Sequence, residues 1–133
     1  MYKVCIVTGA SRGLGRGIAK VLAEERSATV YATARSEAAL NDLASSIKGN
    51  TGVIHPVVLD QSDDSAVEKF ITTVAEKEGR IDLLVNSAYG GLTAMTPHFG
   101  KPFWERPISV FDASIDIGLR SAFVSSAIVA PHM

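Results

Sequence analysis

Three glycines near the N-terminus are spaced in a way that suits the binding of phosphate groups. They are Gly9, Gly13 and Gly15, within residues 8–15 (TGASRGLG), where a short apolar run gives way to a helical pattern. At such a junction Gly9 allows a tight turn, Gly13 leaves room for a pyrophosphate, and Gly15 lets the helix pack closely. The first turn of the helix then offers free backbone N–H groups to an anion. The spacing predicts a phosphate-binding loop, the alternative being a glycine-rich turn that binds nothing.

Two arginines lie where they could distinguish one dinucleotide from another. A glycine loop between the first strand and helix is typical of dinucleotide sites, and NAD sites carry an acidic residue about 20 positions later. Here residues 33–35 read Thr-Ala-Arg instead. With Arg12 in the glycine loop, Arg35 would place two cations near the ribose, which suits a 2′-phosphate. We expect NADP(H) as the cofactor; the alternative is that Arg35 is a solvated residue at the start of a helix.

Two further polar side chains follow apolar runs. Asp60 ends the third run, where its carboxylate could accept a hydrogen bond from an adenine amino group. Its alternative role is that of a turn residue before a helix capped by Ser62. Asn86 ends the fourth run, and its side chain could tie neighbouring strands together and shape the floor of the pocket.

Apolar runs alternate with helical patterns along the whole chain. The runs that predict strands are residues 4–7, 28–33, 53–59 and 81–85. The helix after the glycine loop is expected to bury one face, made of Leu14, Ile18, Val21 and Leu22. This alternation predicts the α/β class, with a doubly wound parallel sheet (a Rossmann fold) of about four strands and the first strand near its middle.

The last part of the chain is expected to form a long amphipathic helix over residues 109–130, after a loop that holds Trp104 and two phenylalanines. Those aromatic side chains could wall a substrate pocket or pack within the loop, and packing is the favoured interpretation.

Composition and charge exclude several classes of protein. A length of 133 residues suits one domain, and a formal net charge of −1 argues against nucleic-acid binding. The single cysteine, Cys5, excludes an internal disulfide and favours a reducing compartment. The three histidines lack metal-ligand spacing, so no metal is expected. No apolar stretch reaches about 18 residues and no signal peptide is recognisable, which favours a cytoplasmic protein.

The glycine loop, Asp60 and residues 84–88 (LVNSA) together resemble the short-chain dehydrogenase/reductase family, over the full length of the chain. Residues 86–89 (NSAY), 103–105 (FWE) and 117–120 (IGLR) look closest to the branch called dehydrogenase/reductase member 1. The resemblance implies hydride transfer between NADP(H) and a small carbonyl or alcohol substrate. It also implies a phosphate and ribose site at Ser11, Arg12, Leu14 and Arg35, an adenine contact at Asp60, and a ribose and nicotinamide side at Asn86, Ala88 and Tyr89.

The chain departs from the family in its catalytic residues. The family uses a Ser, a Tyr and a Lys, the last two as a Tyr-x-x-x-Lys pair. None of Tyr2, Tyr31 and Tyr89 has a lysine four positions later, and Gly118 stands where the family has an asparagine that supports a proton relay. We therefore expect residues 1–133 to be a nucleotide-binding domain truncated before the catalytic residues, and inactive alone.

Two alternatives to this hypothesis remain. The chain could be a non-catalytic NADP-binding or interaction module, such as a truncated isoform that pairs with a longer partner. It could also be an enzyme like the sugar-nucleotide epimerases, although their glycine motif is more usually spaced G-x-x-G-x-x-G. As a separate expectation, the last helix could form a dimer face, as it does in the family that the chain resembles, or it could only cover the sheet.

Overall fold

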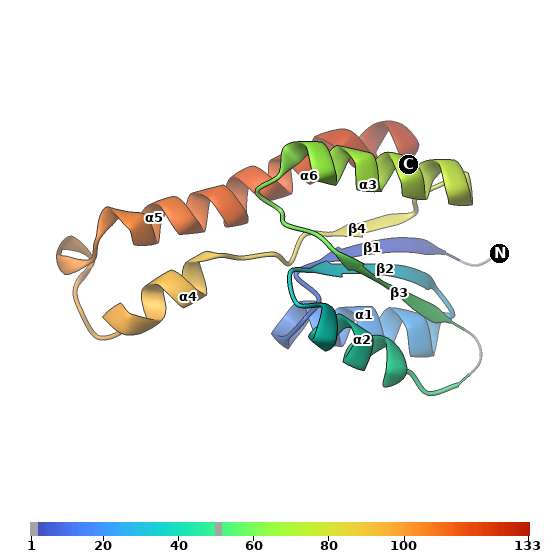
Figure 1. Ribbon diagram of the computed structural model, residues 1–133, viewed down its shortest axis with the longest axis horizontal. Coiled ribbons are helices and arrows are strands. Elements are labelled where there is room, and N and C mark those ends of the chain that lie inside the picture. The colour runs from blue at the N-terminus through green and yellow to red at the C-terminus, as the bar shows by residue number, and fades with distance from the viewer. Residues whose placement is uncertain (1–2, 50–51) are drawn as a thin grey trace.

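The computed structural model describes residues 3–49 and 52–133. Its centre is a sheet of four parallel strands in the order β3-β2-β1-β4. The strands are β1 (Val4–Thr8), β2 (Thr29–Ala34), β3 (Val53–Val58) and β4 (Leu83–Val85). The predicted α/β fold is therefore confirmed, with the first strand inside the sheet and the later strands added on both sides of it (Figure 1).

Helices cover both faces of this sheet, because successive side chains of a buried strand point to opposite sides. On one face, Cys5 and Val7 of β1 pack with α1 (Gly13–Arg26) and α2 (Glu37–Ser45). On the other face, Val4 and Ile6 pack with α3 (Asp64–Glu78) and α6 (Ser121–Val129). Figure 1 shows the two helical layers on either side of the strands.

The first helix contacts the sheet mainly through small residues, and of the predicted apolar face only Ile18 and Leu22 pack, partly buried, against the core. Its buried positions are Gly15, Ala19 and Ala23, which recur every fourth residue along one stripe. Leu14 is 77% exposed and Val21 45% exposed, so their predicted burial is wrong. The reason is that the small stripe brings the helix close to the strands, which leaves room for larger side chains only at its flanks.

The helix ends follow local hydrogen bonding, with one correction to the sequence prediction. Ser36 caps α2 as expected, accepting a hydrogen bond from the Ala39 N–H at 3.3 Å. Ser62 does not cap α3; Asp63 does, accepting from the Ala66 N–H at 3.0 Å. The helix begins at Asp64, one residue later than a Ser62 cap requires, so Asp63 occupies the capping position, and the Ser62 hydroxyl donates to the Asp60 carboxylate at 2.7 Å.

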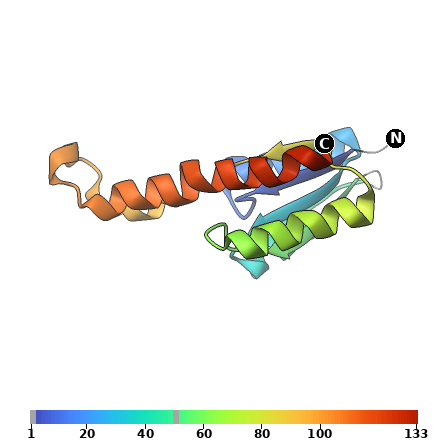
Figure 2. The same cartoon turned by 90° about the horizontal axis from the view of Figure 1, so that it is seen from above.

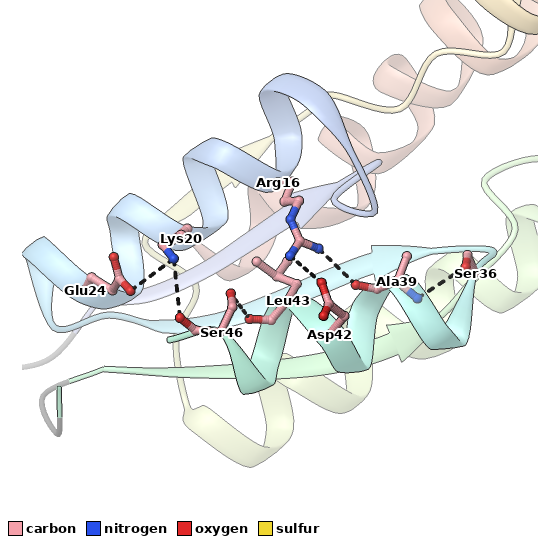
Figure 3. A network of polar contacts seen from close by, with 8 residues as sticks. All are labelled: Arg16, Lys20, Glu24, Ser36, Ala39, Asp42, Leu43 and Ser46. Atoms are coloured by element: carbon pink, nitrogen blue, oxygen red, sulfur yellow. Dashed lines mark hydrogen bonds and ion pairs between the residues drawn. The ribbon is translucent and has the colours of Figure 1, made fainter. Parts of the chain in front are cut away.

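Polar contacts between α1 and α2 hold these two helices together (Figure 3). The Arg16 guanidinium donates to the Ala39 carbonyl at 3.2 Å and to the Asp42 carboxylate at 2.6 Å. One turn further along, the Lys20 ammonium donates to the Ser46 carbonyl at 3.3 Å. The Arg16 contacts join the first turn of α1, which follows Arg12, to the early part of α2, which follows Arg35, and the Lys20 contact joins α1 to the end of α2.

The C-terminal third forms a rod that runs past the end of the sheet (Figures 1 and 2). After α4 (Gly91–Met95) and two 3₁₀ turns, the rod consists of α5 (Ile108–Ser114), a π-helical turn (Ile115–Arg120) and α6, followed by a last 3₁₀ turn. The Arg120 guanidinium makes two hydrogen bonds, at 2.8 and 2.6 Å, to the Asp64 carboxylate at the start of α3. Half of the rod thus packs on the sheet layer, while α5 and α4 pack on each other beyond it.

Two findings in this region bear on the sequence predictions. Trp104 and its neighbours Phe99 and Phe103 are all more than half exposed, so they are not buried against the last helix, although the Phe103 and Trp104 rings contact each other edge to face within the loop, with their centroids 5.3 Å apart. The segment Ile108–His132 is long and apolar enough, by length and composition alone, to cross a membrane, although no uninterrupted apolar stretch marks it in the sequence. Its C-terminal half lies against α3, as expected for a covering helix of an α/β domain.

Candidate cofactor-binding site

A cleft of about 690 Å³ lies at the carboxyl ends of the strands. In a doubly wound sheet this edge, where the chain connections leave in opposite directions, is where ligands bind. The volume is that of an ordinary small-molecule site. Nearly all the predicted site residues line the cleft: Gly9, Ser11, Arg12, Gly13, Leu14, Arg35, Asp60, Ala88 and Tyr89.

The glycine loop is seated tightly on the strand ends but open toward the cleft. Gly9 has a φ of +64°, and a Cβ there would lie 2.7 Å from backbone atoms of Ser87 and Ala88. Gly15 lies beneath the loop and does not line the cleft; a Cβ on it would lie 2.5 Å from the Gly9 carbonyl oxygen. Gly13, with a φ of +56°, has nothing within 4 Å of its Cβ position, which leaves the open space that a phosphate group needs.

The N-terminus of α1 faces this open space. Arg12 precedes the helix in an extended conformation, and its side chain makes no capping hydrogen bond. Gly13 and Leu14, the first two residues of the helix, line the cleft. The first N–H groups of a helix have no partner within the helix and carry its positive dipole end. The loop therefore offers N–H donors and a cation to an anionic ligand.

Thr8 organises the cleft floor and was missed by the sequence analysis. Its buried hydroxyl accepts hydrogen bonds from the N–H groups of Ser87, at 3.1 Å, and Ala88, at 3.2 Å. It also donates to the Val85 carbonyl at 3.4 Å. Because Thr8 ends β1, Val85 ends β4 and the other two partners follow β4, this one side chain joins the two strands that flank the cleft. A threonine between a buried strand and a glycine loop is the signal that could have identified it.

Asp60 has the turn role that the sequence left open, and it also lines the cleft. It lines the cleft, and its carboxylate accepts hydrogen bonds from the Ser62 N–H, at 2.9 Å, and the Ser62 hydroxyl, at 2.7 Å. The Ser62 N–H, then the hydroxyl, and to a smaller extent the charge of Arg35 lower the pKa of Asp60. Asp60 is thus an ionised turn residue in the lining of the cleft, and its contact with adenine stays a prediction.

Two other polar residues at the strand ends contact α6. The Asn86 amide donates to the Ser126 hydroxyl at 3.0 Å, so it ties β4 to α6 and not to a neighbouring strand as predicted. Asn86 does not line the cleft. Gln61 does line it, and its amide donates to the Ser125 hydroxyl at 3.3 Å while its own carbonyl oxygen is buried without a hydrogen-bond partner. Nothing in the sequence pattern singled out Gln61.

The far wall of the cleft is formed by α4 and the C-terminal rod. Tyr89, which is 49% exposed, lines the cleft here together with Ala113 and Ile117. Its hydroxyl lies 3.1 Å from the Ser114 hydroxyl. Among residues 3–49 and 52–133, no group of three or more His, Cys, Asp or Glu side chains could hold a metal ion. The arrangement suits an elongated, anionic organic ligand.

Comparison with known proteins agrees with this geometry. A sequence model of the family described as short chain dehydrogenase matches residues 3–133. The chain is 43% identical over 125 residues to dehydrogenase/reductase SDR family member 1 of Mus musculus, which bears out the predicted branch; the match covers 93% of this chain and 40% of that protein. The chain therefore spans less than half the length of this relative.

Solved structures give the same result. The apo form of LigO from Sphingobium sp. strain SYK-6 matches with a TM-score of 0.82 and 28% identity, over 97% of this chain and 45% of that one. A metagenomic short-chain oxidoreductase in complex with NADP matches with a TM-score of 0.80 and 31% identity, over 98% of this chain and 56% of that one. The chain belongs to the short-chain dehydrogenase/reductase family of oxidoreductases, whose members bind nicotinamide cofactors.

Proposed function

We propose that this chain is the NADP(H)-binding part of an oxidoreductase that transfers hydride to a carbonyl or from an alcohol. The observation that carries the proposal is the pair of arginines in one cleft. Arg12 and Arg35 both line it, and the end of β2, where an NAD site would carry an acidic residue, is Ala34 followed by Arg35. Guanidinium groups bind phosphate oxygens with charge-assisted hydrogen bonds, so this pair suits a 2′-phosphate.

In this proposal, different residues of the cleft bind different parts of the cofactor. The N–H groups at the start of α1 would hold the pyrophosphate, with Gly13 leaving the space for it. Arg12 and Arg35 would hold the 2′-phosphate, and the Asp60 carboxylate would accept from the adenine amino group. When bound, NADPH would supply the hydride to a carbonyl, or NADP+ would accept it from an alcohol; the chain's own residues would bind and orient the cofactor.

Solved relatives support the choice of cofactor. Besides the metagenomic oxidoreductase with NADP, an alcohol dehydrogenase from the archaeon Thermococcus sibiricus, complexed with 5-hydroxy-NADP, matches with a TM-score of 0.82 and 26% identity. Each match covers nearly the whole of this chain and about half of the relative. These complexes belong to those proteins, and the cofactor of this chain is inferred from its own arginines.

Substitution of the arginines tests the proposal. Arg35→Ala is expected to weaken NADPH binding about 10-fold, because a hydrogen bond to a charged group contributes about 1.5 kcal/mol or more. Binding of NADH, which lacks the 2′-phosphate, should change little. Arg26→Ala, an exposed arginine at the other end of α1, is the matched control and should affect neither cofactor. Equal losses for both cofactors in Arg35→Ala would contradict the proposed role.

A further inference from the structure

The Tyr89 hydroxyl sits in a chain of hydrogen bonds whose direction can be worked out. The Ser114 hydroxyl donates to the Val110 carbonyl at 2.8 Å, one turn back in α5. A serine hydroxyl has a single proton, which this bond uses. The 3.1 Å contact between the Tyr89 and Ser114 hydroxyls therefore has Tyr89 as the donor and Ser114 as the acceptor. The phenol oxygen of Tyr89 is then left with its lone pairs free, as an acceptor.

Two glycines make room for this pair of hydroxyls. A Cβ on Gly91 would lie 2.3 Å from both the Ser114 Oγ and the Tyr89 hydroxyl oxygen. A Cβ on Gly118, in the π-helical turn, would lie 3.3 Å from Cδ2 of the Tyr89 ring. The ring thus occupies space that ordinary side chains at these two positions would take, and its place in the cleft wall is defined by the surrounding backbone.

Tyr89 lies at the opposite end of the cleft from the residues proposed to bind the phosphorylated adenosine. Arg35 follows β2 and Asp60 follows β3, whereas Tyr89 follows β4. The ends of β3 and β4 are three strand spacings apart, about 14 Å. A dinucleotide whose adenosine half lies near Arg35 and Asp60 would place its second nucleoside near Tyr89.

We propose that Tyr89 accepts a hydrogen bond from the nicotinamide nucleoside, and that Ser114 is the positioning residue that holds the phenol proton away from the ligand. The donor on the ligand is a ribose hydroxyl or the carboxamide N–H, which share this chemistry. This inference rests on the proposed function. If it is correct, the Tyr89 hydroxyl strengthens the binding of the complete dinucleotide but does not affect the binding of its adenosine half alone.

Paired titrations test this inference. NADPH and adenosine 2′,5′-bisphosphate, which lacks the nicotinamide nucleoside, are each titrated into the purified chain by calorimetry. Tyr89→Phe should weaken NADPH binding by about 2- to 12-fold, the range for one lost hydrogen bond, and leave bisphosphate binding unchanged. Ser114→Ala should give a smaller loss, and Ser114→Thr, which keeps the hydroxyl, should restore wild-type affinity. Ser109→Ala, an exposed serine in α5, is the control.

The outcomes separate this inference from the proposed function. If Tyr89→Phe binds NADPH as tightly as the wild type, or weakens both ligands equally, the inference is wrong while the cofactor site stands. If the wild type binds neither ligand, the proposed function itself fails. The analogue 3-acetylpyridine adenine dinucleotide phosphate, which lacks the amide N–H, identifies the donor. A loss in Tyr89→Phe that persists with this analogue assigns the donor to the ribose, and a loss that vanishes assigns it to the carboxamide.

Discussion

The seating of the glycine loop leads to a prediction that three glycine-to-alanine substitutions can test. Gly9 and Gly13 both have positive φ values, of 64° and 56°, so alanine at either position pays a conformational cost of about 1–2 kcal/mol. Only at Gly9 would the new Cβ also meet fixed backbone, 2.7 Å away. Overpacking of this kind adds about 1–3 kcal/mol. We expect Gly9→Ala to lower the free energy of unfolding by about 2–5 kcal/mol and Gly13→Ala by about 1–2 kcal/mol.

Gly17 supplies the matched control in the same helix. It is exposed within α1, and its Cβ position has nothing within 4 Å. Gly17→Ala should therefore raise the free energy of unfolding by up to about 1 kcal/mol, through helix propensity alone. Urea unfolding followed by circular dichroism measures all three variants. Equal losses in Gly9→Ala and Gly13→Ala would refute the close contact between the glycine loop and the residues after β4.

Three further predictions concern other parts of the chain. Burial, followed by the charge of Lys77, lowers the pKa of His55, which stacks on Tyr31. The contribution of His55 to the free energy of unfolding should therefore be complete above about pH 6.5 and should be lost as the pH falls below it, because the unfolded chain binds the proton more readily. The urea midpoint of His55→Phe should not show this dependence on pH. The 133-residue chain, which contains no Tyr-x-x-x-Lys pair, should show no NADPH turnover with carbonyl substrates, and a measurable rate in a 340 nm assay would contradict this. If a second copy covers the exposed apolar side chains of the rod, Phe123→Glu should shift the mass measured by light scattering toward the monomer, and an unchanged mass would contradict it.

The fold and most of the cleft could be predicted because they depend on local signals. The spacing of Gly9, Gly13 and Gly15 and the alternation of apolar runs with helical patterns each depend on a few neighbouring residues. The same is true of Ser36, whose side chain caps the helix three residues away. The folded structure retains these features because they depend on contacts between residues that are close in the sequence.

The sequence predictions were wrong where another residue, which the local pattern does not single out, takes the predicted position or contact. Three capping residues, Ser62, Asp63 and Asp64, follow one another, and the helix starts at Asp64, so Asp63 and not Ser62 stands at the capping position. The Asn86 amide finds Ser126, forty positions later in the chain, and no strand-end pattern indicates that partner. Leu14 belongs to a helical apolar pattern, but it points toward the cleft because the smaller residues of α1 take the contact with the sheet.

The central claim is that this cleft binds a dinucleotide with a 2′-phosphate, and one comparison tests it directly. Purified chain is titrated with NADPH and, under the same buffer and salt conditions, with NADH. Saturable binding that is about 10-fold or more tighter for NADPH is the predicted result, because two arginines line the cleft and no acidic residue ends β2. Equal or tighter binding of NADH, or no binding of either by a folded chain, would contradict the account.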